Sequence, residues 1–142
     1  MTTVEDRIRV LEDIEEIRRL TARYCVAVAD GDLEALVGLF CADGSFESER
    51  GRFAGSDELR AFYTRVVEPP TNKPFVHNHL IDVDGDDATG IYAVEVHSMR
   101  DGQAHLTAGR YRDSYRRVGS EWLFASRTYE SHLRMHLGDS WM

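Results

Sequence analysis

The sequence predicts an α+β fold in which three helices pack on one face of a curved antiparallel sheet. Residues 4–67 repeat apolar side chains at intervals of three and four, the period of an amphipathic helix. Residues 73–135 alternate apolar and polar side chains and are interrupted by short turns containing Asp and Gly, which is typical of antiparallel strands. Helices and strands do not alternate along the chain, and this separates the layout from a parallel α/β sheet.

The first expected helix begins at a capping box formed by Thr2 and Glu5, which lie three residues apart. Gly31 is expected to end it, because glycine adopts the left-handed conformation that closes many helices. One face carries the side chains that we expect to be buried: Val10, Ile14, Ile17, Thr21, Tyr24 and Val28.

Two shorter helices are expected next. Asp32 is the predicted N-cap of a helix that ends at Asp43-Gly44, and its apolar face holds Leu33, Leu36, Leu39 and Phe40. After a short strand and loop, Ser56 is the predicted N-cap of a third helix, which Pro69-Pro70 stop.

Four long strands complete the prediction, at residues 73–83, 89–99, 104–118 and 121–135. The segments between them, residues 84–87, Asp101-Gly102 and Gly119-Ser120, have the composition of hairpin turns. A sheet that curves around its helices leaves a cavity at its open end. We expect that cavity to be mostly apolar with a few polar groups.

Composition narrows the class of protein. The chain has 142 residues, 42% of them hydrophobic, and we expect one domain covering residues 1–142. A net charge of −8 argues against nucleic-acid or anionic-membrane partners, which require basic surfaces. Cys25 and Cys41 are expected to be free buried thiols, since no CxxC or Cys/His cluster accompanies them. The charged N-terminus has no apolar signal-peptide core, and no apolar run could span a bilayer, so we expect a cytoplasmic protein.

Four stretches in the same order resemble the SnoaL-like group of the NTF2-like superfamily. They are IRRLTARYCVAVADGDLEALVGLFCADGSF, GSDELRAFY, HNHLIDVDGDDATG and AGRYRDSYRRVGSEWLFASRTY. The resemblance implies a cone-shaped α+β barrel, often dimeric through its sheet. The family includes polyketide cyclases, dehydratases, a dehydrochlorinase and non-catalytic small subunits, so the fold alone does not decide the function.

Several family lyases share an Asp–His dyad, in patterns like LDxGD and HFxxN. In this chain the aspartate position is Ala29, and the histidine position is Pro74. Asp30 follows one residue later, rotated about 100° around the helix. Asp30 is therefore either a displaced catalytic residue or simply the exposed end of a helix before the cap at Asp32. His77 is the residue that could compensate for Pro74.

The other candidate catalytic residues are His105, Tyr111 and Arg127. His105 and Tyr111 share one strand face, and an imidazole there could exchange protons near neutral pH. Resemblance to the family dehydratase implies that Tyr111 faces the cavity, and Arg127 corresponds to an arginine of the dehydrochlorinase. Each residue also has a non-catalytic interpretation. His105 could be exposed to solvent, Tyr111 could be a core residue, and Arg127 could form a structural ion pair.

The candidate ligand-binding residues are Asn78, Tyr92, His77 and Tyr24. Asn78 matches the asparagine of HFxxN and should face the cavity by strand alternation. Tyr92 is either a cavity wall or a core aromatic. His77 with His79, like His132 with His136, lacks a third ligand, so we expect no metal. His97 and Glu95 are expected on the outer sheet face.

Two functions remain open. One is a cofactor-free lyase, isomerase or cyclase that acts on a small, apolar, cyclic or aromatic, polyketide-like compound. The other is a non-catalytic ligand-binding or assembly subunit, which the missing dyad favours. Both imply a small hydrophobic ligand and a homodimer or other homo-oligomer. No glycine-rich phosphate loop or dinucleotide motif is present, so we expect no cofactor.

Overall fold

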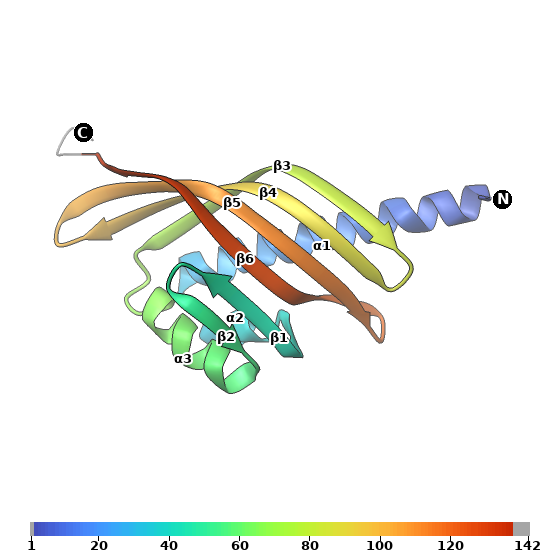
Figure 1. Ribbon diagram of the computed structural model, residues 1–142, viewed down its shortest axis with the longest axis horizontal. Coiled ribbons are helices and arrows are strands. Elements are labelled where there is room, and N and C mark those ends of the chain that lie inside the picture. Colours follow the sequence, from blue (N-terminus) through green and yellow to red (C-terminus); the bar gives the residue numbers. More distant parts are fainter. Residues whose placement is uncertain (1, 138–142) are drawn as a thin grey trace.

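The computed structural model describes residues 2–137 and contains one six-stranded sheet with three helices. The strand order is β2-β1-β6-β5-β4-β3, and every neighbouring pair is antiparallel except β1 with β6. Figure 1 shows α1 running along one face of the bent sheet, with α2 and α3 beside it. The predicted α+β architecture is therefore confirmed, and its concave side faces the helices.

Helix α1 spans Val4–Asp30, and only its second half is packed against the sheet. Its N-cap is Thr3, whose hydroxyl accepts from the N–H of Asp6 while the Asp6 carboxylate accepts from the N–H of Thr3. The predicted capping box was thus misplaced by one residue at each end. Val10 is exposed although the stripe predicted it buried, because the helix extends beyond the sheet there (Figure 1). Gly31 closes the helix with φ 69°, as expected.

Helix α2 covers only Leu33–Val37, so its predicted end at residues 43–44 was wrong. The Asp32 carboxylate does cap it, accepting from the N–H of Ala35 at 3.1 Å. Strand β1 begins already at Phe40 and runs to Ser48, because this segment pairs in parallel with β6. Pairing with the sheet therefore prevails over the helical spacing of the apolar residues.

Strand β2, Gly51–Ala54, leads into α3, Ser56–Val67. The N-cap of α3 is Gly55 rather than Ser56, and the Glu58 carboxylate accepts from the N–H of Ala54 at 2.7 Å.

Four long strands follow: β3 (Asn72–Asp84), β4 (Asp87–Arg100), β5 (Gln103–Val118) and β6 (Glu121–His136). They form the predicted hairpins, and the turn residues Gly85, Gly102 and Gly119 all have positive φ.

Irregularities in the strand pairing change which side chains face the helices. In β3 the pairing with β4 shifts between His77 and Leu80, where Asn78 has φ 56°. In β6 the pairing with β5 shifts around His132, which leaves one extra residue there, and shifts again around Ala125. A β-bulge of this kind reverses the alternation of side chains beyond it. Gly109 lies opposite the β6 bulge, and a Cβ there would overlap the carbonyl oxygen of Glu130.

Candidate functional site

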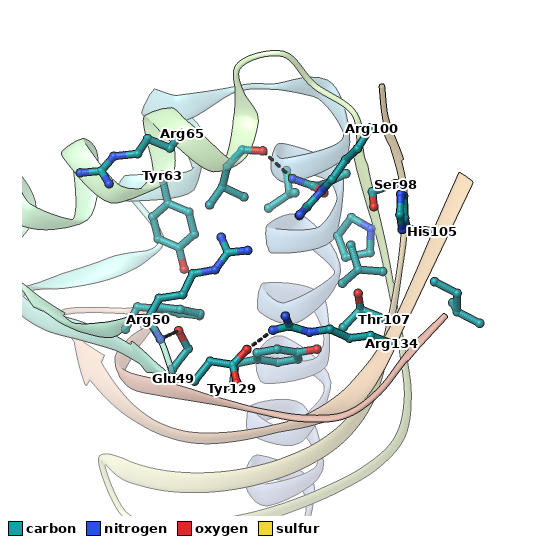
Figure 2. Close-up of a pocket in the computed structure, with 18 of the residues that line it drawn as sticks. Glu49, Arg50, Tyr63, Arg65, Ser98, Arg100, His105, Thr107, Tyr129 and Arg134 are labelled. Carbon is teal, nitrogen blue, oxygen red and sulfur yellow. Dashed lines mark hydrogen bonds and ion pairs between the residues drawn. The ribbon is translucent and has the colours of Figure 1, made fainter. Parts of the chain in front are cut away.

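A cavity of about 310 Å³ opens between the helices and the concave side of the sheet. Side chains from α1, α3 and the strands β1, β3, β4, β5 and β6 line it (Figure 2). Its apolar wall includes Val28, Phe46, Phe62 and Val96. The rings of Phe46 and Phe62 stack with centroids 4.9 Å apart, which fixes this wall in one arrangement.

The inner end of the cavity is built from tyrosines, among them Tyr24 and Tyr111 from the predicted set. The hydroxyl oxygens of Tyr24 and Tyr63 are 2.9 Å apart and share a hydrogen bond. Burial raises the pKa of Tyr24, Tyr63 and Tyr111 well above the usual value. These phenols therefore keep their protons at neutral pH and offer O–H groups rather than phenolates.

Tyr129 lines the same cavity from β6, where it pairs with Tyr111. Its hydroxyl is buried and lies near Ser131, but no partner among residues 2–137 meets it with hydrogen-bond geometry. A buried hydroxyl without a partner is unfavourable. A ligand with an oxygen acceptor would satisfy it.

Arg127 lies behind the tyrosines and not in the cavity wall. It is fully buried and donates two hydrogen bonds of 2.8 Å to Asp113, which also accepts from the Tyr115 hydroxyl at 2.7 Å. Its guanidinium carbon lies 3.7 Å from the ring centroid of Tyr111 and 4.3 Å from that of Tyr24. Burial opposes the charge, but Asp113 outweighs it and raises the pKa of Arg127.

The expectation that Arg127 holds a ligand in the cavity is corrected by this geometry, because Arg127 does not line the cavity and Asp113 takes its Nε and Nη2 donors. The buried Nη1 has no hydrogen-bond partner among residues 2–137. We name this buried assembly of Arg127, Asp113, Tyr24 and Tyr111 the floor. Asp113 was missed in the sequence, although it lies two residues after Tyr111 and must share its strand face.

His105 lines the outer end of the cavity, as strand alternation predicted. Thr107 and Tyr111 lie on the same face of β5 and also reach the cavity. The His105 ring is 5.2 Å from that of His136, and Figure 2 shows it next to Ser98. His105 is thus an imidazole with access to a bound molecule.

Asp30 does not reach the cavity. It is the exposed last residue of α1, so the structure favours a helix end over a displaced catalytic aspartate. At the dyad positions, the Ala29 carbonyl accepts from the Lys73 ammonium at 2.5 Å, and Pro74 is part of the cavity wall. Neither residue can transfer a proton through its side chain.

Three of the predicted ligand-binding residues also lie elsewhere. Asn78 is exposed, because the bulge at this residue turns it away from the face that Pro74 occupies. His77 is exposed on the outer face, 4.0 Å from Glu95. Tyr92 is a core residue whose hydroxyl lies 2.7 Å from that of Tyr115 and donates to it, since the single Tyr115 proton goes to Asp113; burial raises the pKa of Tyr92 to about 12.

His97 lies 3.6 Å from Glu95 on the outer face, as expected. No three His, Cys, Asp or Glu side chains among residues 2–137 are arranged to hold a metal ion. The absence of a metal and of a cofactor from the protein's function stays a prediction. No helix in that part of the chain is long and apolar enough to cross a membrane.

Charged side chains that the sequence analysis did not single out surround the outer end of the cavity. We call this region the mouth, and its residues are Glu49, Arg50, Arg65, Arg100 and Arg134. They come from the β1–β2 turn, α3, the end of β4 and β6. No spacing in the sequence connects them, so only the folded structure reveals the group.

Several solved structures share this fold. Rv3472 from Mycobacterium tuberculosis, a protein of unknown function, is 26% identical, with 92% of this chain and 77% of that chain covered and a TM-score of 0.82. LinA is 20% identical, with 96% and 97% covered and a TM-score of 0.87. A protein from Novosphingobium aromaticivorans named as a scytalone dehydratase is 18% identical, with 88% and 87% covered and a TM-score of 0.80.

No curated protein matches the chain in sequence. The model of one family, described as the SnoaL-like domain, matches residues 9–128. This range contains α1 from its second turn, all the cavity-lining tyrosines except Tyr129, and the floor. Since the match covers most of the chain, the protein belongs to the SnoaL-like domain family.

Proposed function

We propose that the protein is a cofactor-free lyase or isomerase that acts on a small, largely apolar, cyclic or aromatic molecule bound in the cavity. The observation that carries the proposal is that one cavity joins an apolar wall to an accessible imidazole, His105, and to the buried Tyr129 hydroxyl, which has no hydrogen-bond partner among residues 2–137. Two similar structures bear the names of eliminating enzymes, a hexachlorocyclohexane dehydrochlorinase and a scytalone dehydratase.

His105 is the proposed proton acceptor, because it is an imidazole that lines the cavity and forms no ion pair with a carboxylate among residues 2–137. It removes a proton from carbon, and the negative charge moves to an oxygen of the substrate. The proton then returns to another carbon, which is an isomerisation, or a leaving group departs with its electron pair, which is an elimination.

Tyr129 is the proposed hydrogen-bond donor to that oxygen. Burial raises its pKa, so it stays a donor while charge develops. His105 and Tyr129 line the same cavity, so one bound molecule could present an acidic carbon to the imidazole and an oxygen to the phenol.

Hydrogen–deuterium exchange tests the proposal without a known substrate. A panel of cyclic ketones and hydroxylated naphthalenes is incubated with the protein in D₂O, and carbon-bound deuterium is followed by NMR. We expect the wild type to accelerate exchange in at least one compound. His105→Gln should abolish the acceleration while the compound still binds.

One observation favours a second function, that of a ligand-binding subunit without catalysis. The dyad positions hold Ala29 and Pro74, and Asp30 is exposed. In that case compounds from the panel bind, but neither the wild type nor His105→Gln exchanges their protons. Thr107→Trp, which fills the cavity, is the control that must prevent binding under either function.

A further inference from the structure

The mouth of the cavity is positively charged in a chain that is strongly acidic. Among residues 2–137, four arginines and one glutamate line the cavity, whereas the whole chain has a net charge of −8. The arginines come from four separate elements, so the fold, and not a basic run in the sequence, gathers them. A local excess of positive charge at a concave site attracts anions.

Three of the four arginine side chains point into the cavity, and two of these three form no ion pair among residues 2–137. Figure 2 shows the guanidinium groups of Arg50, Arg100 and Arg134 turned toward the middle of the cavity, whereas Arg65 points away. Arg134 is ion-paired with Glu49. No carboxylate among residues 2–137 forms an ion pair with Arg50 or Arg100.

We infer that the ligand carries an oxyanion, such as a carboxylate, which binds between Arg50 and Arg100 while its apolar ring packs in the cavity. Planar guanidinium groups match the geometry of a carboxylate or sulfonate and bind it with paired hydrogen bonds. The ring then lies along the wall of Phe62 and Val96. The inference rests on the proposed function for the location of the ligand and adds its chemical class.

The negative charge of Glu49 provides a separate test of whether the mouth selects its ligand by charge. Its carboxylate neutralises Arg134 and would repel a bound anion. Removing this negative charge should therefore strengthen the binding of an anion and leave the binding of a neutral molecule unchanged. A purely structural role of the pair predicts no such difference.

Two fluorescent probes with the same aromatic skeleton test the inference. 8-Anilinonaphthalene-1-sulfonate carries an oxyanion, and N-phenyl-1-naphthylamine lacks it. At low salt we expect the wild type to bind the sulfonate more tightly. The double variant Arg50→Gln/Arg100→Gln should weaken the binding of the sulfonate at least about tenfold. Its affinity for the neutral probe should stay unchanged. Arg7→Gln, an exposed arginine of α1, is the matched control and should change neither affinity.

Further measurements distinguish failure of the oxyanion inference from failure of the proposed function. Glu49→Gln should strengthen the binding of the sulfonate but not of the neutral probe. Loss of folding could not produce this result. Displacement by 2-naphthoate but not by 2-naphthamide would extend the result to carboxylates. If the wild type and the arginine variants bound both probes with equal affinity, the inference that the ligand carries an oxyanion would be overturned. The proposed function would still stand. Failure of both probes to bind, or binding that survives Thr107→Trp, would overturn both.

Discussion

Two arginines of strand β6 form ion pairs with carboxylates in opposite surroundings. At the floor, the side chains of Arg127 and Asp113 are both 0% exposed. At the mouth, those of Arg134 and Glu49 are 60% and 58% exposed. The floor pair is shielded from water and from any ligand, so it organises the tyrosines around it. The mouth pair is hydrated, holds little folding energy and stays available for recognition. Both pairs join an arginine to a carboxylate, so the degree of burial decides whether such a pair stabilises the fold or is available to bind a ligand.

The largest expected effect comes from breaking the floor pair. Asp113→Asn leaves the Arg127 charge buried without its counter-charge and should lower the free energy of unfolding by about 3–5 kcal/mol. Denaturant unfolding measures the change. The double variant Arg127→Met/Asp113→Leu removes both charges and should recover much of the loss. If the double variant were as unstable as the sum of the single changes, the pair would not be the source of the effect.

The two floor tyrosines and Tyr63, which is hydrogen-bonded to Tyr24, should make the protein sensitive to alkali. Burial holds the pKa of Tyr24, Tyr63 and Tyr111 well above 10.0 in the folded protein. The unfolded chain loses these protons near its ordinary pKa, so stability is complete below pH 10 and falls as the pH rises above it. Each such group contributes a slope of about 1.4 kcal/mol per pH unit.

Replacing one of these phenols sharpens the comparison between floor and cavity wall. Tyr24→Phe should reduce the slope of unfolding free energy above pH 10 by one proton's worth, measured by urea unfolding at several pH values. Tyr129→Phe should reduce it less, because Tyr129 is less deeply buried. An unchanged slope in Tyr24→Phe would show that the Tyr24 phenol titrates equally in both states.

The smallest expected effect is at the mouth. Glu49→Gln should change the free energy of unfolding by at most about 1 kcal/mol, because exposed ion pairs are hydrated and screened. Urea unfolding at low and high salt measures this change, and any difference should vanish at high salt. A loss comparable to that of Asp113→Asn would remove the distinction between the two pairs.

The sequence was sufficient for the fold because its signals are local and agree with one another. Apolar spacing predicted the buried part of α1, and glycine-containing turns located the hairpins. Regular alternation along β5 correctly brought His105 and Tyr111 to one face. The second helix was overextended because its last apolar residues, Leu39 and Phe40, fit a helix and a strand equally well.

The site was less accessible from the sequence, for two physical reasons. Bulges interrupt alternation, so Asn78 turned outward against the prediction. Tertiary proximity has no local pattern, so Arg50, Arg100 and Arg134 could not be grouped before the fold was known. Arg127 was noticed, but its partner Asp113 decides what it can do, and only the structure shows how closely the two are joined.

The extra residue at His132 sets the direction in which the outer side chains of β6 point. Arg127 and Tyr129 face inward before His132, and Arg134 and His136 face inward after it, although the odd interval between the two sets would otherwise oppose them. Deleting His132 would rotate the outer set to the convex side and leave the inner set untouched. A change at His132 should therefore alter the side chains at the entrance of the cavity while Arg127 and Tyr129 keep their places.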